Sequence, residues 1–596
     1  GQVMQVADNT YDASLYPALN QLGHRAKQTP YDALVEALAY TWFNRFCALR
    51  YMEIHDFLDH GLRVLSHPSQ PGRFQILEHA QDVAEDLGLD RNRVIDLKLA
   101  NKDEVLFREL LLGQCHQLHE TMPFLFEALD DDTELMLPDN LTRTDSILRA
   151  LVDDIPEQDW DNVEIIGWLY QFYISEKKDQ VIGKVVKSED IPAATQLFTP
   201  NWIVQYLVQN SIGRQWMLTY PDSPLVKDMP YFIPPAEQAE AAQQKLLELT
   251  PNELDPEQIK VLDPACGSGH ILVEAYNTLK AIYQERGYRP RDIPKLILEN
   301  NLYGLDLDER AAQLAGFALM MKAREDDRRI LNRDISLNVL AIQSTEQMPI
   351  AATWQALNLN QQHQAGDMQS MFAEMTEPAQ AQDDDDALFS ETLEAFIDAK
   401  TLGSLIEIPH EKQPGLVAML AKIETLETTS QDPAQKSAVQ TLLPIFKQAV
   451  LLAQQYDAVI ANPPYMGKLK KLPILGDLTK KEYPNSKSDL FAVFMERGFK
   501  WLKPEGFNAM VTMQSWMFLS SYEKLREEIL KRHTILSMAH LGARGFASIG
   551  GEVVSTTAFV MQKGFLPGYQ STFLRLVDGK SETEKAEMFK AAVNSD

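Results

Sequence analysis

The chain has 596 residues, 45% of them hydrophobic, which exceeds what one hydrophobic core usually accommodates, so we expect at least two domains. Its 85 acidic and 56 basic residues give a formal net charge of −29, which argues against a protein that coats nucleic acid without specificity. A protein that approaches DNA through one locally basic surface is compatible with this charge. The three cysteines lie far apart and argue against a disulfide framework. Because the sequence shows neither a signal peptide nor a long apolar run, it predicts a soluble, cytoplasmic protein that does not bind membranes.

Apolar residues recur at helical spacing over the first third of the chain, from residue 12 to about residue 180. This pattern predicts an α-helical N-terminal domain over residues 1–185. Cys115, His116 and His119 lie in one of the predicted helices, but no further ligands accompany them. We interpret them as ordinary helix positions and predict no metal site.

From residue 261 onward, short apolar segments alternate with amphipathic helical segments, which is typical of a parallel sheet built from βα units. The pattern predicts a doubly wound α/β domain over residues 186–566, and its predicted strands are 261–266, 301–308, 337–343, 456–464, 506–513, 534–541 and 553–561. The alternation stops at about 344–450, where length and polarity predict an insertion, part mobile and part helical. Residues 567–596 are expected to form a C-terminal tail or the start of a further domain.

A glycine-rich turn directly follows the first predicted strand and precedes a helix; it reads Asp263-Pro264-Ala265-Cys266-Gly267-Ser268-Gly269. Glycines at such a turn let the backbone approach a ligand at a helix N-terminus. Asp306 and Leu307 end the next strand, where a carboxylate can hold the two hydroxyls of an adenosine ribose. These two features predict an adenosine-containing cofactor, but they do not separate a dehydrogenase from a methyltransferase. Cys266 has no neighbouring base in sequence, so we do not interpret it as a nucleophile.

The fourth predicted strand separates these two classes, because it ends in Asn462-Pro463-Pro464-Tyr465. The amino nitrogen of adenine is a poor nucleophile, since its lone pair is delocalised into the ring. The side-chain oxygen of Asn462 and the main-chain carbonyl of Pro463 would accept its N–H bonds and push the lone pair toward an incoming methyl group. Tyr465 would offer a face on which an extruded base stacks. No strong base is required if the methyl donor is an activated sulfonium, so positioning and desolvation would carry most of the rate.

Three motifs in this order, Phe198-Thr199-Pro200, then the glycine-rich turn, then Asn462 to Tyr465, resemble the γ-group amino methyltransferases that use S-adenosylmethionine. The resemblance covers roughly residues 190–565, and Asn-Pro-Pro-Tyr is typical of members that methylate adenine N6. It implies a Rossmann-like methyltransferase domain with a mostly parallel, seven-stranded sheet. It also implies that Thr199 and Pro200, with Phe198 in the same motif, cover the methionine part of the cofactor. The glycine-rich turn would surround the cofactor, Asp306 with Leu307 would lie at its ribose, and Asn462 would meet both the cofactor and the target amine.

The sequence departs from the γ-group pattern at two points. Ile271 stands where relatives more often carry Phe after the glycine-rich turn. The acidic motif expected after the third strand has three candidates, Asp334, Asn338 and Asp398, and the sequence does not choose between them.

A finer resemblance rests on residues 31–53, 197–216 and 314–329, which are similar to the PglX family of adenine methyltransferases from BREX phage-defence systems. This resemblance implies methylation that marks host DNA as self, together with other proteins of the defence system. Lys468, Lys470 and Lys471 begin a cluster of lysines that continues with Lys480, Lys481 and Lys487. A solvated loop is the commoner role of such a cluster, but its position beside the expected base pocket favours contacts with phosphates of double-stranded DNA that carries a flipped adenine. Phe491, Phe494 and Phe499 are predicted to form the buried face of the next helix.

Three other functions are compatible with parts of the sequence. A restriction-modification enzyme with a fused endonuclease would need metal-binding carboxylates ahead of a strand lysine, and the first third of the chain offers only Ser175-Glu176-Lys177-Lys178. A catalytically silent DNA-binding subunit is disfavoured by the intact Asn462 to Tyr465 motif. Methylation of RNA or protein amides is less compatible with the resemblance. Because only a short segment follows the last predicted strand, DNA sequence would be read elsewhere, by a missing recognition domain, the N-terminal domain, the insertion or a partner.

Overall fold

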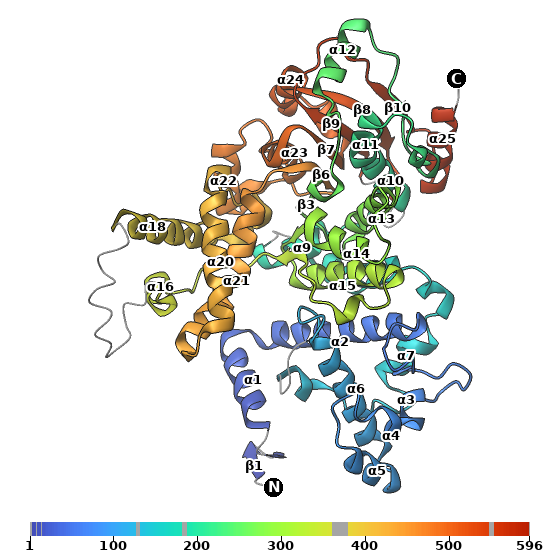
Figure 1. The fold of residues 1–596 in the computed structure, drawn as a ribbon, viewed down its shortest axis with the longest axis vertical. Coiled ribbons are helices and arrows are strands. Elements are labelled where there is room, and N and C mark those ends of the chain that lie inside the picture. Colours follow the sequence, from blue (N-terminus) through green and yellow to red (C-terminus); the bar gives the residue numbers. More distant parts are fainter. Residues whose placement is uncertain are drawn as a thin grey trace. The chain divides into compact units, whose positions relative to one another are not determined.

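The computed structural model of the chain describes residues 3–6, 9–12, 15–126, 132–181, 187–359, 379–546 and 554–594. The chain divides into two compact units, a helical unit and an α/β unit, and Figure 1 labels their helices and strands. The helical unit comprises Gly1–Tyr170, Pro290–Lys295 and Gln313–Ser336. The α/β unit comprises Gln171–Arg289, Leu296–Ala312 and Leu337–Asp596.

The helical unit is built around the long helix α2 (Tyr31–Ile54). The other helices of its N-terminal stretch are α1 (Tyr16–Gln28), α3 (Gln75–Glu78), α4 (Ala80–Val83), α5 (Arg91–Leu99), α6 (Asp103–His119) and α7 (Ile147–Asp153), with the start of α8 (Glu164–Val181) and the 3-10 turns η2 (Asp132–Met136) and η3 (Glu157–Trp160). Ahead of them, β1 (Val3–Val6) and β2 (Asn9–Asp12) form an antiparallel pair that the helical pattern did not predict. Most of α15 (Glu309–Asp326) and η9 (Ile330–Asn332) also belong to this unit.

Several polar side chains of this unit are paired in its interior. Arg50 and Glu53, one helical turn apart in α2, form an ion pair of 2.6 Å with both side chains at most 1% exposed. His116 pairs with Glu134 at 2.5 Å, and His119 bonds the carbonyl of Phe126 at 2.6 Å. In the part of the chain that the structure describes, His, Cys, Asp and Glu side chains nowhere form a group of three suited to a metal ion.

The α/β unit contains one eight-stranded sheet with the strand order β10-β8-β9-β7-β6-β3-β4-β5. Its strands are β3 (Val261–Asp263), β4 (Leu302–Asp306), β5 (Asn338–Ala341), β6 (Tyr456–Ala461), β7 (Leu502–Met513), β8 (His533–Gly542), β9 (Thr556–Lys563) and β10 (Thr572–Arg575). All pairings are parallel except those that β9 makes with β7 and β8. The α/β fold class and the seven predicted strands are confirmed. The eighth strand, β10, lies in the segment predicted as a tail and pairs with β8, so the predicted number of strands was one too low.

The order of the strands reverses direction at β3. From β3 the chain continues to β4 and β5 on one side, whereas β6 and β7 lie on its other side. Open parallel sheets bind ligands at such a switch point, in the crevice outside the carboxyl ends of the strands. Both faces of these central strands are covered, since Val261, Leu262 and Val459 are completely buried, as expected for a parallel sheet between helices.

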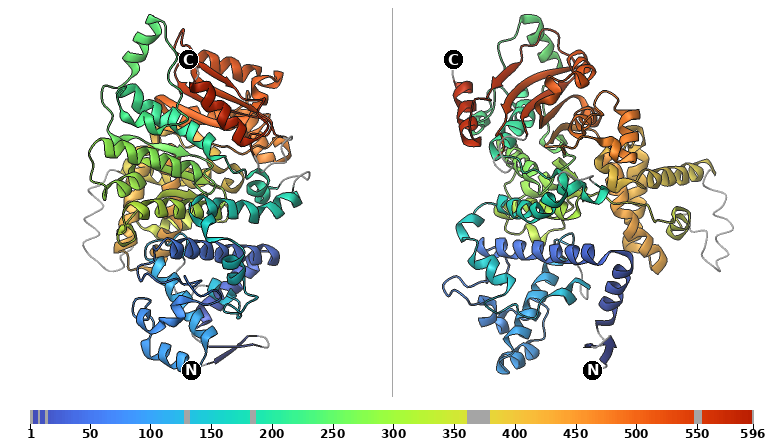
Figure 2. Two further views of the ribbon diagram at one scale, coloured as in Figure 1. Left: turned by 90° about the vertical axis from the view of Figure 1, so that its right-hand side faces the viewer. Right: turned by 180° about the vertical axis from the view of Figure 1, so that it is seen from behind.

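Helices and short turns cover the sheet and connect its strands (Figure 2). Before β6 they are α9 (Ile191–Thr195), α10 (Asn201–Val208), η5 (Gln209–Gly213), α11 (Arg214–Thr219), η6 (Pro224–Asp228), α12 (Glu240–Leu249), η7 (Pro256–Gln258), α13 (His270–Glu285) and η8 (Ile297–Asn301). The short helix α14 (Ile293–Leu296) belongs to the helical unit except for Leu296. After β6 they are η12 (Leu469–Lys471), α22 (Pro473–Glu482), α23 (Leu490–Trp501), η13 (Gln514–Met517), η14 (Ser520–Tyr522), α24 (Glu523–Arg532) and α25 (Glu582–Asn594). Among the described residues, no helix is both long and apolar enough to cross a membrane.

The predicted insertion between β5 and β6 is helical where the structure describes it. It contains α16 (Ile350–Leu357), α18 (Ala379–Ala395), α19 (Ala399–Leu402), η10 (Gly403–Leu405), η11 (His410–Lys412), α20 (Gln413–Thr429) and α21 (Pro433–Ala453), and residues 360–378 lie outside the described residues. Phe389 and Phe446 of the insertion are fully buried in the same hydrophobic cluster as Val459 of β6. The insertion is therefore packed into the core of the α/β unit and is not an appended lobe.

Candidate active site

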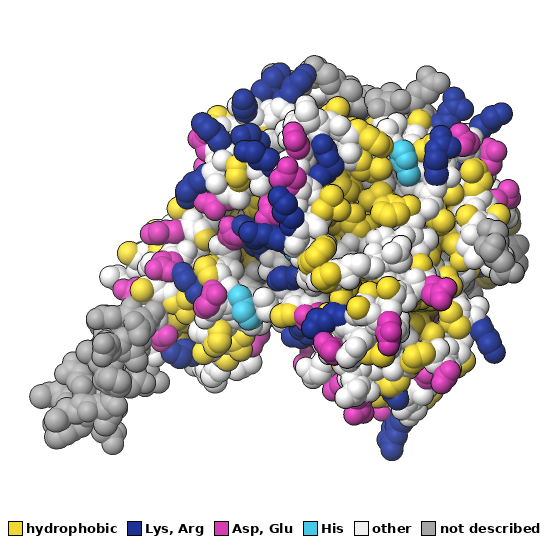
Figure 3. All heavy atoms as spheres, turned by 90° about the horizontal axis from the view of Figure 1, so that it is seen from above, with side chains coloured by type: hydrophobic (Ala, Val, Ile, Leu, Met, Phe, Trp, Pro, Cys, Tyr) yellow, Lys and Arg dark blue, Asp and Glu magenta, His cyan; other side chains and the backbone are white. Residues whose placement is uncertain are grey.

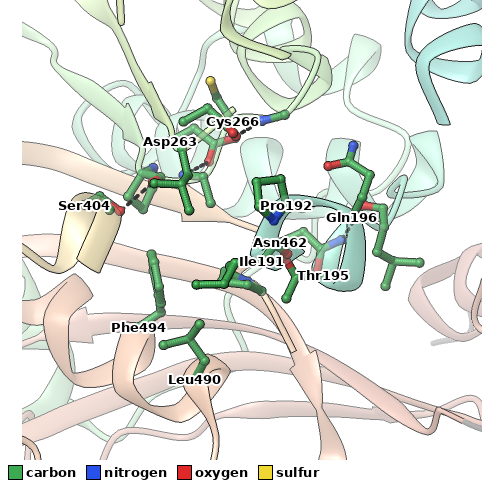
Figure 4. Close-up of a pocket in the computed structure, with 18 of the residues that line it drawn as sticks. Ile191, Pro192, Thr195, Gln196, Asp263, Cys266, Ser404, Asn462, Leu490 and Phe494 are labelled. Atoms are coloured by element: carbon green, nitrogen blue, oxygen red, sulfur yellow. Dashed lines mark hydrogen bonds between the residues drawn. The ribbon is translucent and has the colours of Figure 1, made fainter. Parts of the chain in front are cut away.

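A cavity lies at the carboxyl ends of β3, β4 and β6, the switch point of the sheet (Figure 4). It encloses about 970 Å³, part of which is open to solvent. The sequence-predicted residues that line it are Phe198, Thr199, Asp263, Pro264, Ala265, Cys266, Gly267, Ser268, Asp306, Leu307, Asn462 and Pro464. The cavity thus brings together three motifs that are up to 264 positions apart in the chain, from Phe198 to Asn462.

The glycine-rich turn forms one wall of the cavity. Gly267 and Gly269 have φ angles of +52° and +84°, a backbone region that favours glycine, and Gly269 caps the N-terminus of α13. Asp263 is 1% exposed, and its carboxylate accepts a hydrogen bond from the amide of Ala265 at 3.1 Å. Burial raises the pKa of Asp263 to about 8, opposed by that hydrogen bond. Burial, with the nearby carboxylates of Asp306 and Asp263, raises the pKa of the Cys266 thiol well above its ordinary value, so it stays protonated and is a poor nucleophile.

Asp306, at the end of β4, holds the turn in place. Its Oδ2 accepts a hydrogen bond from the amide of Gly267 and its Oδ1 one from the amide of Asp308, both at 2.8 Å. Burial raises the pKa of Asp306 to about 6, so the group is mainly ionised at neutral pH. Each carboxylate oxygen can accept two hydrogen bonds. The Asp306 carboxylate therefore keeps acceptor capacity for a hydroxyl group of a ligand in the cavity.

Asn462 connects the third motif to the first. Its Nδ2 donates hydrogen bonds to the carbonyl of Leu197 at 3.1 Å and to Thr199 Oγ1 at 3.0 Å. Because a carbonyl can only accept, the contact with Leu197 fixes which end of the amide is the nitrogen. Asn462 Oδ1 is buried and accepts no hydrogen bond from any described residue. Such an oxygen costs about 1–3 kcal/mol unless a donor pairs with it, which indicates a ligand with an N–H or O–H group.

The remaining predicted residues adjoin the cavity without lining it. Pro200, Gly269, Pro463 and Tyr465 are chain neighbours of lining residues. The hydroxyl of Tyr465 donates to the carbonyl of Val511 at 2.9 Å, and its ring lies edge-on to Phe491, with centroids 6.1 Å apart. These contacts fasten the motif to β7 and hold the tyrosine ring rigidly.

Several lining residues were not predicted from the sequence. They come from α9 and the segment after it (Ile191, Pro192, Thr195, Gln196, Leu197), from the start of α13 (His270, Ile271), from the insertion (Thr401, Leu402, Gly403, Ser404, Leu405) and from α22 and α23 (Leu475, Leu490, Phe494). Phe491, Phe494 and Phe499 are buried, which confirms the predicted apolar face of α23, and Phe494 also borders the cavity. His270 packs against Phe198 with ring centroids 4.6 Å apart, and burial lowers its pKa to about 4, so it is neutral. Apart from Ile271, which follows the glycine-rich turn, these residues belong to none of the sequence motifs, so only their position in the fold identifies them as part of the site.

The three candidates for the acidic motif after the third strand lie in different places, none in the lining of this cavity. Asp334 belongs to the helical unit, where its carbonyl accepts a hydrogen bond from Lys295 at 3.0 Å. Asn338 begins β5, at the amino end of the sheet, and bonds the carbonyls of Leu298 and Glu299. Asp398 precedes α19, the helix that leads into the cavity wall.

The lysines after Tyr465 are exposed. Lys468 directly precedes the short turn η12, Lys470 and Lys471 are its last two residues, and Lys468 has a φ angle of +58°. Figure 3 shows a face of the molecule on which Lys and Arg side chains gather beside a patch of apolar side chains. Local basic surfaces therefore exist despite the net charge of −29.

Comparison with known proteins confirms the resemblance predicted from the motifs. The family model of the Eco57I restriction-modification methylases matches residues 300–546. The chain is 58% identical, over 98% of its length, to the adenine-specific methyltransferase BrxX of Escherichia coli O9:H4 (strain HS). It is 38% identical, over 94% of its length, to the adenine-specific methyltransferase PglX of Lacticaseibacillus casei (strain Zhang). The chain spans 48% and 46% of these relatives, or about half of each. A structure of a DrdV–DNA complex matches 97% of this chain and 43% of its own, with 12% identity and a TM-score of 0.40.

Proposed function

We propose that this chain is the catalytic part of a DNA methyltransferase that transfers a methyl group from S-adenosylmethionine to the N6 amino group of adenine. The observation that carries this proposal is the buried, unpaired Oδ1 of Asn462 in a cavity shared with the glycine-rich turn and Asp306. An amino group donates the hydrogen bond that this oxygen lacks. The names of the two curated relatives, both adenine-specific methyltransferases, point the same way.

The residues of the cavity fit the proposed cofactor. Asp306 has acceptor capacity for a ribose hydroxyl, and the glycine-rich turn offers backbone amides at the N-terminus of α13. Thr199, with Phe198 and Pro200, would border the methionine part, close to Asn462. When bound, S-adenosylmethionine supplies a methyl group that its sulfonium already activates.

The side chains around the target amine would work by orientation and not by general-base catalysis. Asn462 Oδ1 and the carbonyl of Pro463 would accept the two N–H bonds of the amine, which turns its lone pair toward the methyl group. Tyr465, fixed by its bond to Val511, would stack on the flipped adenine. His270 and Cys266 are neutral, so they place no competing charge beside the sulfonium. The amine has one proton in excess once it carries the methyl group, and the part of the cavity that is open to solvent would give that proton a route to water.

Double-stranded DNA is the substrate in this proposal, and the exposed Lys468, Lys470 and Lys471 would contact its phosphates. The relatives are about twice as long as this chain, so the part that reads the DNA sequence would lie outside it. We further propose that the protein acts in the cytoplasm with other proteins of a BREX-type phage-defence system, as the sequence resemblance implies.

The direct test is nucleoside mass spectrometry of DNA from cells with and without the natural full-length protein and its genetic neighbours, with Asn462→Ala as the control. N6-methyladenine that requires Asn462 is the expected result. Absence of methylated adenine, in cells where the wild-type protein is folded and binds S-adenosylhomocysteine, would refute the proposed reaction and leave a silent binding subunit. Magnesium-dependent cleavage by the purified protein would instead indicate a fused endonuclease.

A further inference from the structure

The insertion between β5 and β6 supplies part of the cavity wall. Five consecutive residues from the end of α19 and from η10 line the cavity: Thr401, Leu402, Gly403, Ser404 and Leu405. They stand more than 90 positions after Asp306 and more than 50 before Asn462 in the chain. None of the sequence motifs includes these residues, so the sequence did not predict that they line the cavity.

Side-chain hydrogen bonds fasten this segment to the rest of the α/β unit. The hydroxyl of Ser404, which is 4% exposed, donates to the carbonyl of Pro264 in the glycine-rich turn at 2.6 Å. Lys400 Nζ donates to the carbonyl of Ile342, which follows β5, at 2.5 Å. Thr401 Oγ1 donates to Ser188 Oγ at 2.8 Å. The segment is therefore held by three hydrogen bonds to other parts of the α/β unit and is pre-organised beside the turn.

Gly403 keeps space open inside this wall. Its φ and ψ angles are +56° and −139°, a region that residues other than glycine rarely adopt. A Cβ built on Gly403 would meet only one atom within 4 Å, Cδ1 of Leu307 at 3.9 Å. Leu307 directly follows Asp306, so the open space at Gly403 adjoins the carboxylate expected at the ribose.

The order of the strands sets the order in which the three motifs lie along the cavity. Asn462 directly follows β6, the glycine-rich turn follows β3, and Asp306 ends β4, and these strands are neighbours in that order. In Figure 4, Ser404 lies on the opposite side of the drawn pocket from Asn462, Thr195 and Gln196. A ligand whose reacting end is at Asn462 and whose ribose is at Asp306 therefore places its remaining part against Leu307 and the insertion.

We infer that Leu402 to Leu405 of the insertion, with Leu307, form the subsite for the purine ring of the cofactor. The identity of this ligand rests on the proposed function. Leucine side chains and a bare glycine backbone provide an apolar slot suited to a flat ring. In the predicted pattern, an acidic residue after the third strand was expected at the cofactor. Residues of the insertion would occupy that position instead. The cofactor site would then depend on a segment that belongs to none of the predicted strands and motifs.

Isothermal titration calorimetry with S-adenosylhomocysteine tests this inference without requiring catalysis. Gly403→Ala should weaken binding at least tenfold, because it strains the backbone and fills the open space. Ser404→Ala should weaken it roughly threefold to tenfold, because it removes the hydrogen bond to Pro264. Thr425→Ala, an exposed position on α20 of the same insertion, is the matched control and should stay within about twofold of the wild type.

A second ligand shows which part of the cofactor is bound more weakly by each variant. 5′-Methylthioadenosine carries the purine and ribose but lacks the amino-acid part, so Gly403→Ala should weaken it as strongly as S-adenosylhomocysteine. Thr199→Val, at the other end of the cavity, should weaken only S-adenosylhomocysteine. Melting temperatures without ligand show whether each variant is folded, and if Gly403→Ala is not, Ser404→Ala carries the test.

These measurements test the proposed cofactor and the proposed purine subsite separately. If the wild-type chain binds neither ligand, the proposed cofactor is wrong and the purine subsite falls with it. If the wild type binds both ligands while folded variants of Gly403 and Ser404 bind them equally well, the insertion is not the purine subsite. Weakening of S-adenosylhomocysteine alone by Gly403→Ala would place the segment at the amino-acid end and would also overturn the inference.

Discussion

Removing the hydroxyl of Thr199 tests how the amide of Asn462 is oriented. Thr199 is 5% exposed, and its Oγ1 accepts one of the two hydrogen bonds that Asn462 Nδ2 donates, at 3.0 Å. Thr199→Val removes that bond, worth about 1 kcal/mol, which corresponds to roughly a fivefold lower rate of methyl transfer. Asn462→Ala removes the acceptor itself, and loss of one pre-organised catalytic group lowers kcat by about 10²–10³. The two effects should not add, because Thr199 acts through Asn462.

The assay is single-turnover methyl transfer to DNA at saturating cofactor, with both single variants and the double variant of the full-length protein. Thr199→Val should cost roughly fivefold alone but less than about twofold when Asn462 is already alanine. Thr195→Val is the control, because Thr195 also lines the cavity but donates its hydroxyl to Ile191 within its own helix, at 2.7 Å. An equal loss in both backgrounds would refute the argument that Thr199 orients the amide.

Burial raises the pKa of Asp306 to about 6, so its carboxylate is lost as the pH falls through that value. Calorimetric affinity for S-adenosylhomocysteine should fall up to about tenfold per pH unit below pH 6, and Asp306→Asn should abolish this fall; a wild-type profile that is flat below pH 6 would contradict it. A separate change near pH 8 would come from Asp263, whose pKa burial raises to about 8. Replacement of the three exposed lysines, Lys468, Lys470 and Lys471, by alanine should flatten the slope of log DNA affinity against log salt by about 0.9 for each phosphate that they neutralise, and an unchanged slope would remove them from the DNA interface. Leu262→Ala, at a fully buried position of β3, should lower the free energy of unfolding of the α/β unit by about 2–5 kcal/mol in urea titrations, and a change below about 1 kcal/mol would show that this core relaxes.

Local sequence patterns were sufficient to predict the strands and turns that lie around the motifs. Short apolar segments such as residues 456–461 are buried on both faces, so their composition alone indicates central strands of a parallel sheet. The turn after β3 contains two residues with positive φ angles, and both are glycine, the residue that adopts such angles most readily. The strand β10 was not predicted because it is a short edge strand with half of its side chains exposed, and it lacks the continuous apolar run of the central strands.

The sequence by itself indicated the type of chemistry that we propose, because an amide, two prolines and a tyrosine after a core strand, together with a glycine-rich turn, are local features that need no knowledge of distant contacts. Only the tertiary structure decided which residues complete the cavity. Asn462 Oδ1 is left unpaired because Leu197 and Thr199, more than 260 positions earlier, bind its nitrogen. Gly403 borders the same space because the insertion shares the hydrophobic core of the sheet. Contacts between segments so far apart depend on how whole elements pack, and no short stretch of sequence records them.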